Sequence, residues 1–76
     1  MALGNEGDWD GAIAEYREAL HLNPNNGNAH YFLAMALERK GNNEEALAEY
    51  RAAHELAPQN PLYRQGYERL LRQVNH

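Results

Sequence analysis

Histidine side chains could bind a metal or transfer protons, but their spacing in this chain supports neither. The four stand at His21, His30, His54 and His76. No two are four residues apart, the spacing that places two ligands on one helix face, and no carboxylate cluster completes a site. We therefore expect no metal site. His30 and His54 are predicted to be hydrogen-bonded packing residues, and His21 and His76 to be exposed.

Nucleophilic and phosphate-binding chemistry also finds few candidates. The sequence contains no Cys, Ser or Thr, which excludes disulfides, zinc–thiolate sites and the common acyl-transfer nucleophiles. The acidic pair Glu44–Glu45 is read as a solvated helix start, where negative charge complements the helix dipole. No glycine-rich segment resembles a phosphate-binding loop. We expect a non-catalytic protein that uses no cofactor.

Charge is distributed unevenly along the 76 residues, whose net charge is −4. Residues 1–26 carry −4, residues 27–60 carry −2 and residues 61–76 carry +2. An acidic body argues against nucleic acid as a partner, because phosphate binding needs a cationic face. No apolar run approaches the roughly 20 residues that span a bilayer, so no membrane insertion is expected. We expect a soluble protein, with the cytoplasm favoured over secretion and the compartment left open.

An internal repeat organises the chain. When the sequence is shifted by 34 residues, 13 of the 26 aligned positions in residues 1–26 are identical to those in 35–60, where average composition predicts roughly two. Apolar and alanine positions in "AIAEYREAL" and "ALAEYRAAH" recur at three- and four-residue spacing, which indicates a buried helical stripe. The repeat therefore predicts two equivalent helices.

Helix ends are marked by local signals. Pro24 and Pro58 must follow the helices that precede them, because proline lacks a donor and clashes with the preceding turn. Gly41 suits a left-handed turn after a helix, and Asp8 or Asn42 is expected to cap the helix that follows it. The pattern predicts helices over residues 8–22, 28–40, 43–56 and 60–74, with residues 1–6 as the stub of a further helix.

The residues that recur match a known pattern. The complete unit supplies Leu33, Ala34, Leu37, Gly41, Ala46, Tyr50, Ala53 and Pro58. This arrangement resembles the tetratricopeptide repeat, although His30 and Leu37 stand where Trp and Tyr are common. The resemblance implies an all-α helix–turn–helix solenoid of about four antiparallel helices in a right-handed superhelical stack. On this resemblance we expect residues 1–76 to form a single domain, in which 1–26 are the second half of a repeat, 27–60 a complete repeat and 61–76 a C-terminal capping helix.

The resemblance also implies a function, the binding of a protein or peptide segment in a groove lined by the first helix of each repeat. An apolar strip from Tyr31 and Met35 beside carboxylate-binding Arg69 and Arg72 favours an acidic and hydrophobic partner. Alternatively, Tyr31 and Met35 only fill the core between helices. The groove residues that the resemblance predicts are Asn28, Tyr31, Met35, Glu38, Arg39, Leu62, Gln65, Arg69, Arg72 and Gln73.

Two other functions remain open. Stacking of neighbouring helices buries the apolar faces of such an array, and the helix predicted over 8–22 lacks most of one neighbour. Trp9, Ile13 and Tyr16 are the candidates for exposure there, and exposed apolar patches generally mark interfaces. The chain is then either the C-terminal piece of a longer array or a protein that forms a homo-oligomer through this face. A regulatory appendage of a larger protein is the other alternative.

Overall fold

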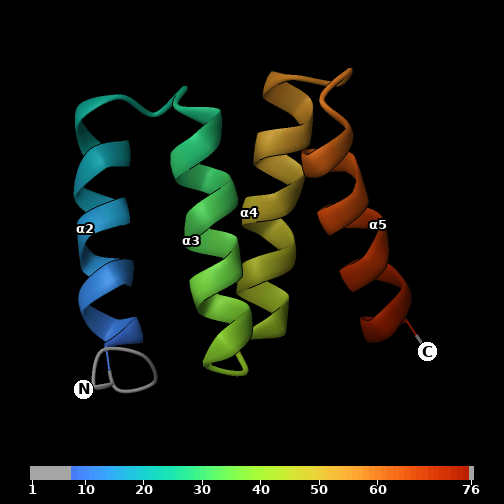
Figure 1. Cartoon of the computed structure of the whole chain (residues 1–76), viewed down its shortest axis with the longest axis horizontal. Helices are drawn as coiled ribbons and strands as arrows, with labels where there is room; N and C mark the ends of the chain where they lie inside the picture. The colour runs from blue at the N-terminus through green and yellow to red at the C-terminus, as the bar shows by residue number, and fades with distance from the viewer. Residues whose placement is uncertain (1–7, 76) are drawn as a thin grey trace.

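Four α-helices follow one another in the computed structural model, which describes residues 8–75. They are α2 (Trp9–Leu22), α3 (Gly27–Arg39), α4 (Asn43–Leu56) and α5 (Pro61–Val74). Figure 1 shows them side by side in chain order, each antiparallel to the one before. The all-α prediction is confirmed, and each predicted helix boundary lies within one residue of the observed one. The stub predicted over residues 1–6 lies outside the described residues.

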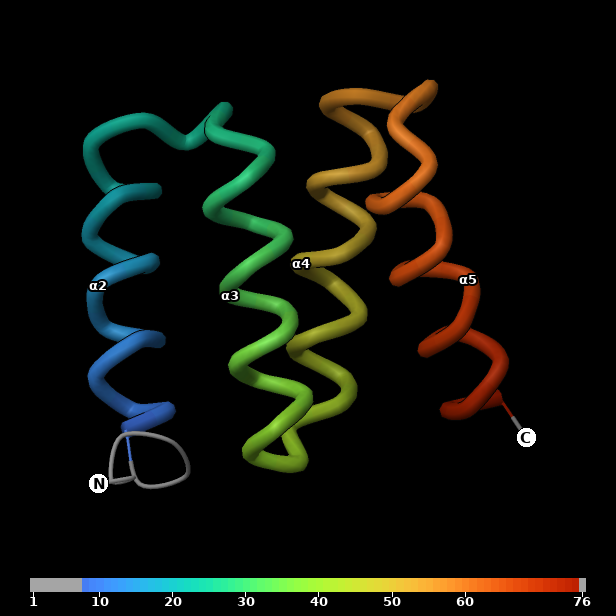
Figure 2. Tube along the Cα trace, in the orientation of Figure 1, coloured from blue at the N-terminus to red at the C-terminus, as the bar shows by residue number. Residues whose placement is uncertain are grey.

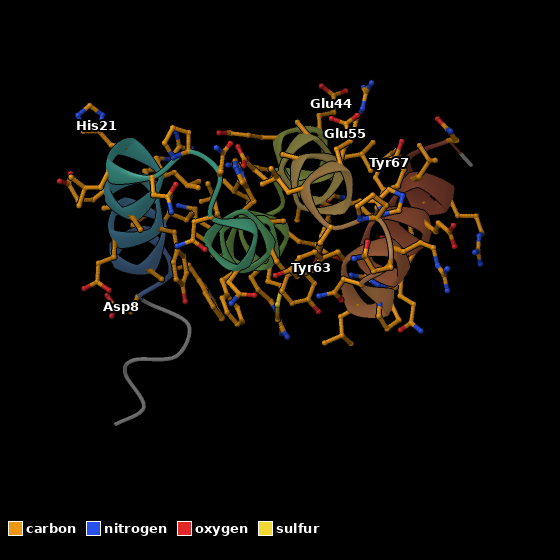
Figure 3. All side chains as sticks on the ribbon, turned by 90° about the horizontal axis from the view of Figure 1, so that it is seen from above. Asp8, His21, Glu44, Glu55, Tyr63 and Tyr67 are labelled. Atoms are coloured by element: carbon orange, nitrogen blue, oxygen red, sulfur yellow. The ribbon has the colours of Figure 1, made fainter. Side chains whose placement is uncertain are left out.

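The helices form a row in which each contacts its neighbours in the chain. α3 packs on α2 and α4, and α5 packs on α4. The trace in Figure 2 shows α2 and α5 as the two outer helices. Seen from above, α3 and α5 lie toward one side of the row and α4 toward the other (Figure 3). This staggered stack, 35 × 33 × 18 Å in extent, leaves α4 covered by two helices and α2 by one among the described residues.

The core is centred on the contact between α3 and α4. Leu33 and Leu37 of α3 are 2% and 1% exposed, and Ala46 and Tyr50 of α4 are 0% and 1% exposed. Leu70 of α5 completes this cluster from the other side. Full burial of each leucine side chain stabilises the fold by about 1.5–3 kcal/mol. The predicted buried stripe of α4 is confirmed at Ala46, Tyr50 and Ala53, whereas Leu56 at its end is 42% exposed.

The turn between α3 and α4 follows the sequence signal. Gly41 has φ +86°, a left-handed conformation that glycine adopts without a Cβ penalty. Its N–H donates to the Glu38 carbonyl, and the Asn42 N–H donates to the Leu37 carbonyl. This pair of bonds satisfies two of the unpaired carbonyls at the end of α3. The predicted role of Gly41 is confirmed.

The predicted capping residues are wrong. Asp8 and Asn42 stand at the N-cap positions of α2 and α4, but neither side chain caps its helix. Their ψ angles, 19° and 68°, lie outside the extended region that N-cap geometry requires. Asn26 and Asn60 have extended backbones instead, and their side chains accept from backbone N–H groups of α3 and α5. The backbone conformation, which the sequence alone does not show, determines which asparagine side chains cap a helix.

Gly66 lets α5 approach α4 closely. A Cβ at this position would lie 2.6 Å from Cε1 of Tyr50, well inside van der Waals contact. The helix-weakening cost of an internal glycine, roughly 1 kcal/mol relative to alanine, is offset here by the packing of Tyr50 against bare backbone. Tyr50 can then lie buried between both neighbouring helices.

Candidate functional site

Two adjoining hollows lie along α3 and α5 and share Arg69. The first has a volume of about 350 Å³ and the second about 460 Å³. The first is lined by residues of α3 and α5, and the second also includes Tyr50 of α4. Of the predicted groove residues, these hollows bring together Tyr31, Met35, Glu38, Arg39, Leu62, Gln65, Arg69 and Arg72.

A charged network from three helices forms the floor where the hollows meet. The two Arg69 guanidinium nitrogens donate to the two Glu38 carboxylate oxygens at 2.6 and 2.9 Å. The Tyr50 hydroxyl donates to Glu38 Oε1 at 3.0 Å, and Arg69 also donates to that hydroxyl at 3.3 Å. Bidentate pairs of this kind are directional as well as strong. The network therefore connects α3, α4 and α5 at one point.

The network changes the titration of its members. The hydrogen bond from Arg69 lowers the pKa of the Glu38 carboxyl below its usual value, against a smaller opposing effect of burial. Burial, together with the hydrogen bond to Glu38, raises the pKa of Tyr50 to about 12. The hydrogen bond to Glu38 likewise raises the pKa of Arg69. Near neutral pH the site thus holds a carboxylate, a guanidinium and a neutral phenol.

The Tyr31 ring, which lines the first hollow, packs against three other aromatic rings. The Tyr31 ring centroid lies 5.2 Å from that of Tyr63, 5.7 Å from that of Tyr50 and 5.6 Å from that of Phe32. Such distances are typical of favourable aromatic pairs. Tyr31 and Met35 are both partly buried against the core cluster, and both line a hollow. The two alternatives from the sequence are therefore compatible, since each side chain fills core space and also forms groove surface.

The remaining predicted residues differ in their surroundings. Asn28 accepts a hydrogen bond from the Tyr63 hydroxyl, so it links α3 to α5 and does not line either hollow. Arg39 lies over the Trp9 ring, 5.7 Å from its centroid. Arg72 lines the first hollow, and no ion pair involves it within residues 8–75. Gln73 is exposed on α5 but lines neither hollow.

The candidates for self-association are only partly exposed, because they lie against α3. Ile13 and Tyr16 pack on the core cluster, and the Tyr16 ring stacks on Phe32 at 5.9 Å. Trp9 is partly buried and contacts Arg39. The reason is rotational: Trp9, Ile13 and Tyr16 share the side of α2 that faces α3. Whether they take part in self-association stays a prediction.

The structure confirms part of what the sequence predicts for the histidine side chains. His30 hydrogen-bonds to the Glu49 carboxylate at 2.6 Å and to the Pro24 carbonyl at 2.8 Å, so its predicted packing role is confirmed. His54 stacks on Tyr67 at 5.9 Å, so its predicted packing role is confirmed, but its buried Nδ1 has no hydrogen-bond partner among residues 8–75. His21 is exposed, and His76 lies outside the described residues.

Within residues 8–75 no helix is long and apolar enough to cross a membrane. Residues 8–75 also contain no group of three His, Asp or Glu side chains that could hold a metal ion.

Comparison with protein families identifies the stack. A family model described as a tetratricopeptide repeat matches residues 1–61. The chain belongs to the tetratricopeptide repeat family. The family is associated with protein–protein interaction and is typically non-catalytic. In this tetratricopeptide repeat protein the match ends at the first residue of α5. A comparison with curated proteins finds no match.

Sequence reasoning missed three features of the groove. Gly66 and Glu68 line the first hollow, although neither was among the predicted groove residues. Tyr50 was assigned to the core, yet its hydroxyl reaches the groove floor through Glu38. Helical spacing could have indicated Glu68, because it lies next to Arg69 and one turn from Gln65. The hydroxyl position of Tyr50 has no signal in the sequence.

Proposed function

We propose that this tetratricopeptide repeat protein is a non-catalytic scaffold that binds an acidic and hydrophobic protein segment along α3 and α5. The observation that carries the proposal is the pair of adjoining hollows that share Arg69. Eight residues predicted for the groove from the sequence line them. Their chemistry combines an aromatic and aliphatic wall with several cations.

The groove offers separate places for apolar and anionic groups. Tyr31 and Leu62 line the first hollow together with Arg72, and Leu62 is 57% exposed. An apolar side chain can pack on Tyr31 and Leu62 while a carboxylate next to it pairs with Arg72. Arg69 already holds the Glu38 carboxylate through two hydrogen bonds. We therefore assign the main carboxylate contact to Arg72 and a positioning role to Arg69.

Pools of labelled peptides test this function. Fluorescence anisotropy would compare a pool that alternates Asp or Glu with Leu or Phe and a matched pool in which Lys or Arg replaces the acids. We expect the acidic pool to bind more tightly, with an affinity that falls as salt rises because the charges are screened. Equal binding of both pools would contradict the proposed specificity.

Matched charge reversals locate the contact. Arg72→Glu should weaken binding of the acidic pool by about tenfold, which corresponds to about 1.4 kcal/mol, because it replaces an attraction by a repulsion between like charges. Arg51→Glu makes the same charge change on α4, where Arg51 is exposed and pairs with Glu55, and should leave binding nearly unchanged. If both variants bind alike while circular dichroism shows both to be folded, the groove assignment is wrong.

A further inference from the structure

One face of α2 is less covered than the same face of α4. The alanines Ala46 and Ala53 of α4 are fully buried, whereas their counterparts in the 34-residue register, Ala12 and Ala19, are only partly buried. Leu22 is 76% exposed, against 42% for its counterpart Leu56. Glu15 is likewise exposed where its counterpart Glu49 is partly buried. Together, Ala12, Glu15, Ala19 and Leu22 form what we call the open face of α2.

The neighbour that covers this face of α4 is α3. Ala46 belongs to one cluster with Leu33, Ala34 and Leu37 of α3. Beside that cluster, Glu49 of α4 pairs with His30 of α3 at 2.6 Å. A helix that covers the open face of α2 in the same manner therefore needs apolar residues spaced like those of α3. It also needs a partner for Glu15, the counterpart of Glu49.

The outer face of α5 supplies such a surface. In the same register Leu37 corresponds to Leu71 and His30 to Arg64. A hollow of about 470 Å³ lies on this face, lined by Glu68, Leu71, Arg72 and Asn75. Arg64 is exposed, and no ion pair involves it within the part of the chain that the structure describes. This outer face thus combines an aliphatic side chain with cations.

Charge favours the match between the two outer helices. The open face of α2 carries Glu15, with exposed Asp8 and Glu18 near it. The chain from residue 61 onward carries +2 and the first 26 residues carry −4. We propose that the outer face of α5 in one copy docks on the open face of α2 in a second copy. The docking keeps the register of the α3–α4 contact, and Arg64 of one copy pairs with Glu15 of the next.

The contact would be weak. Glu68 stands at the position of Ala34, which is fully buried where α3 approaches α4. A glutamate there holds the two helices further apart and loses hydration as they approach. The interface is also heterologous, because different faces of the two copies meet. Each assembly therefore still has an uncovered α2 face at one end and an uncovered α5 face at the other. The protein would therefore lengthen into chains as its concentration rises.

Sedimentation equilibrium of the full chain, from low micromolar to millimolar concentration, tests the proposal. The mean mass should rise continuously with concentration, and added salt should reduce it because it screens the charge pairs. A monomer at every concentration would overturn the proposal. A mass that stops at the dimer would overturn the heterologous geometry.

Charge reversal identifies the two faces. Glu15→Arg and Arg64→Glu each place like charges at the contact, and each should weaken association about tenfold. The two variants mixed together, or the double variant, should regain association because both put opposite charges in contact. Glu44→Arg and Arg51→Glu make the same charge changes on α4 and should leave the mass unchanged. A symmetric contact of α2 with α2 would leave Arg64→Glu without effect, which would contradict the proposal.

A gain-of-association variant guards against loss of folding. Glu68→Ala restores the residue that α3 has at this position and replaces glutamate by a better helix former. We expect it to strengthen association about tenfold, since it removes a charged group from the contact. Circular dichroism should show an unchanged or higher helix content. Weaker or unchanged association of this variant would mean that α5 does not dock in the register of α3.

Discussion

α2 and α4 have nearly the same inward-facing residues but different environments. Tyr50 of α4 is 1% exposed and is held between α3 and α5, whereas Tyr16 of α2 is only partly buried and stacks on Phe32. Neither helix has a side-chain cap at its start. The number of neighbouring helices therefore determines how deeply these side chains are buried, and the local sequence contributes little.

This difference shows where the stability of a helical stack resides. A helix in the interior of the row buries its stripe on two sides, but an outer helix of the same sequence buries it on one. The tyrosine that both repeats share is a core residue in α4 and a partly buried residue in α2. Substitutions at equivalent positions should therefore have unequal effects.

Removal of the two tyrosine rings should give the largest contrast. Tyr50→Ala should lower the free energy of unfolding by about 4 kcal/mol, because it leaves a cavity among buried residues. Tyr16→Ala should lower it by about 1–2 kcal/mol, since less area is buried there. Urea denaturation followed by circular dichroism measures both. Equal losses would show that α2 is covered as fully as α4. If Tyr50→Ala does not fold, the Tyr50→Leu and Tyr16→Leu pair allows the comparison.

Glycine substitutions in the two outer helices should have opposite signs. Gly66→Ala places a Cβ 2.6 Å from the Tyr50 ring and should destabilise the fold by about 1–3 kcal/mol through overpacking. Gly11→Ala meets only the side chain of Asp8, which is exposed and can rotate away. It should therefore stabilise the fold by up to about 1 kcal/mol through helix propensity. Thermal unfolding midpoints would show the two shifts, and a stabilising Gly66→Ala would contradict the close approach of α5.

Helix caps give a third contrast of moderate size. The Asn60 side chain accepts from the backbone N–H groups of Leu62 and Tyr63, so Asn60→Ala should cost about 1 kcal/mol. Asn42 makes no such bond at the start of α4, and Asn42→Ala should cost a few tenths of that. The free energies come from urea denaturation. A larger loss at Asn42 would mean that local caps contribute to the difference between α2 and α4.

Much of the fold could be predicted from the sequence because its signals are local. Proline and glycine positions gave the helix ends, and the 34-residue repeat gave the order and the core of α4. The caps at Asn26 and Asn60 could not be predicted, since they depend on backbone ψ angles. The family match confirms the family, whereas the right-handed twist of a longer stack stays a prediction.

For the candidate site, the identity of the lining residues was easier to predict than the contacts between them. The resemblance to the tetratricopeptide repeat predicted eight of the residues that line the two hollows. The pairing of Glu38 with Arg69, 31 residues apart, depends on how two helices are stacked. Trp9, Ile13 and Tyr16 were the candidates for exposure on α2. Their side chains lie toward α3, because the rotation of α2 against its neighbour decides which face stays uncovered.

The smallest predicted effect concerns the carboxylate that holds Tyr50. In the 34-residue register the counterpart of Glu38 is Gly4, so the sequence supplies no equivalent carboxylate for Tyr16. Glu38→Gln weakens the bonds to Arg69 and should lower the free energy of unfolding near neutral pH by up to about 1 kcal/mol, because the pair is partly exposed. Glu55→Gln is the matched control, since its pair with Arg51 is more exposed.

The pH dependence separates this charge effect from a change in packing. The pKa of Glu38 is lowered in the folded state from its ordinary value of 4.5, so the stability it contributes is fully present above that value. This contribution is lost as pH falls through the lowered folded pKa. The difference between the wild type and Glu38→Gln should therefore shrink in acid, when urea denaturation is repeated from pH 7 downward. A stability difference that stays constant across this pH range would show that Glu38 stabilises Tyr50 by packing and not by its charge.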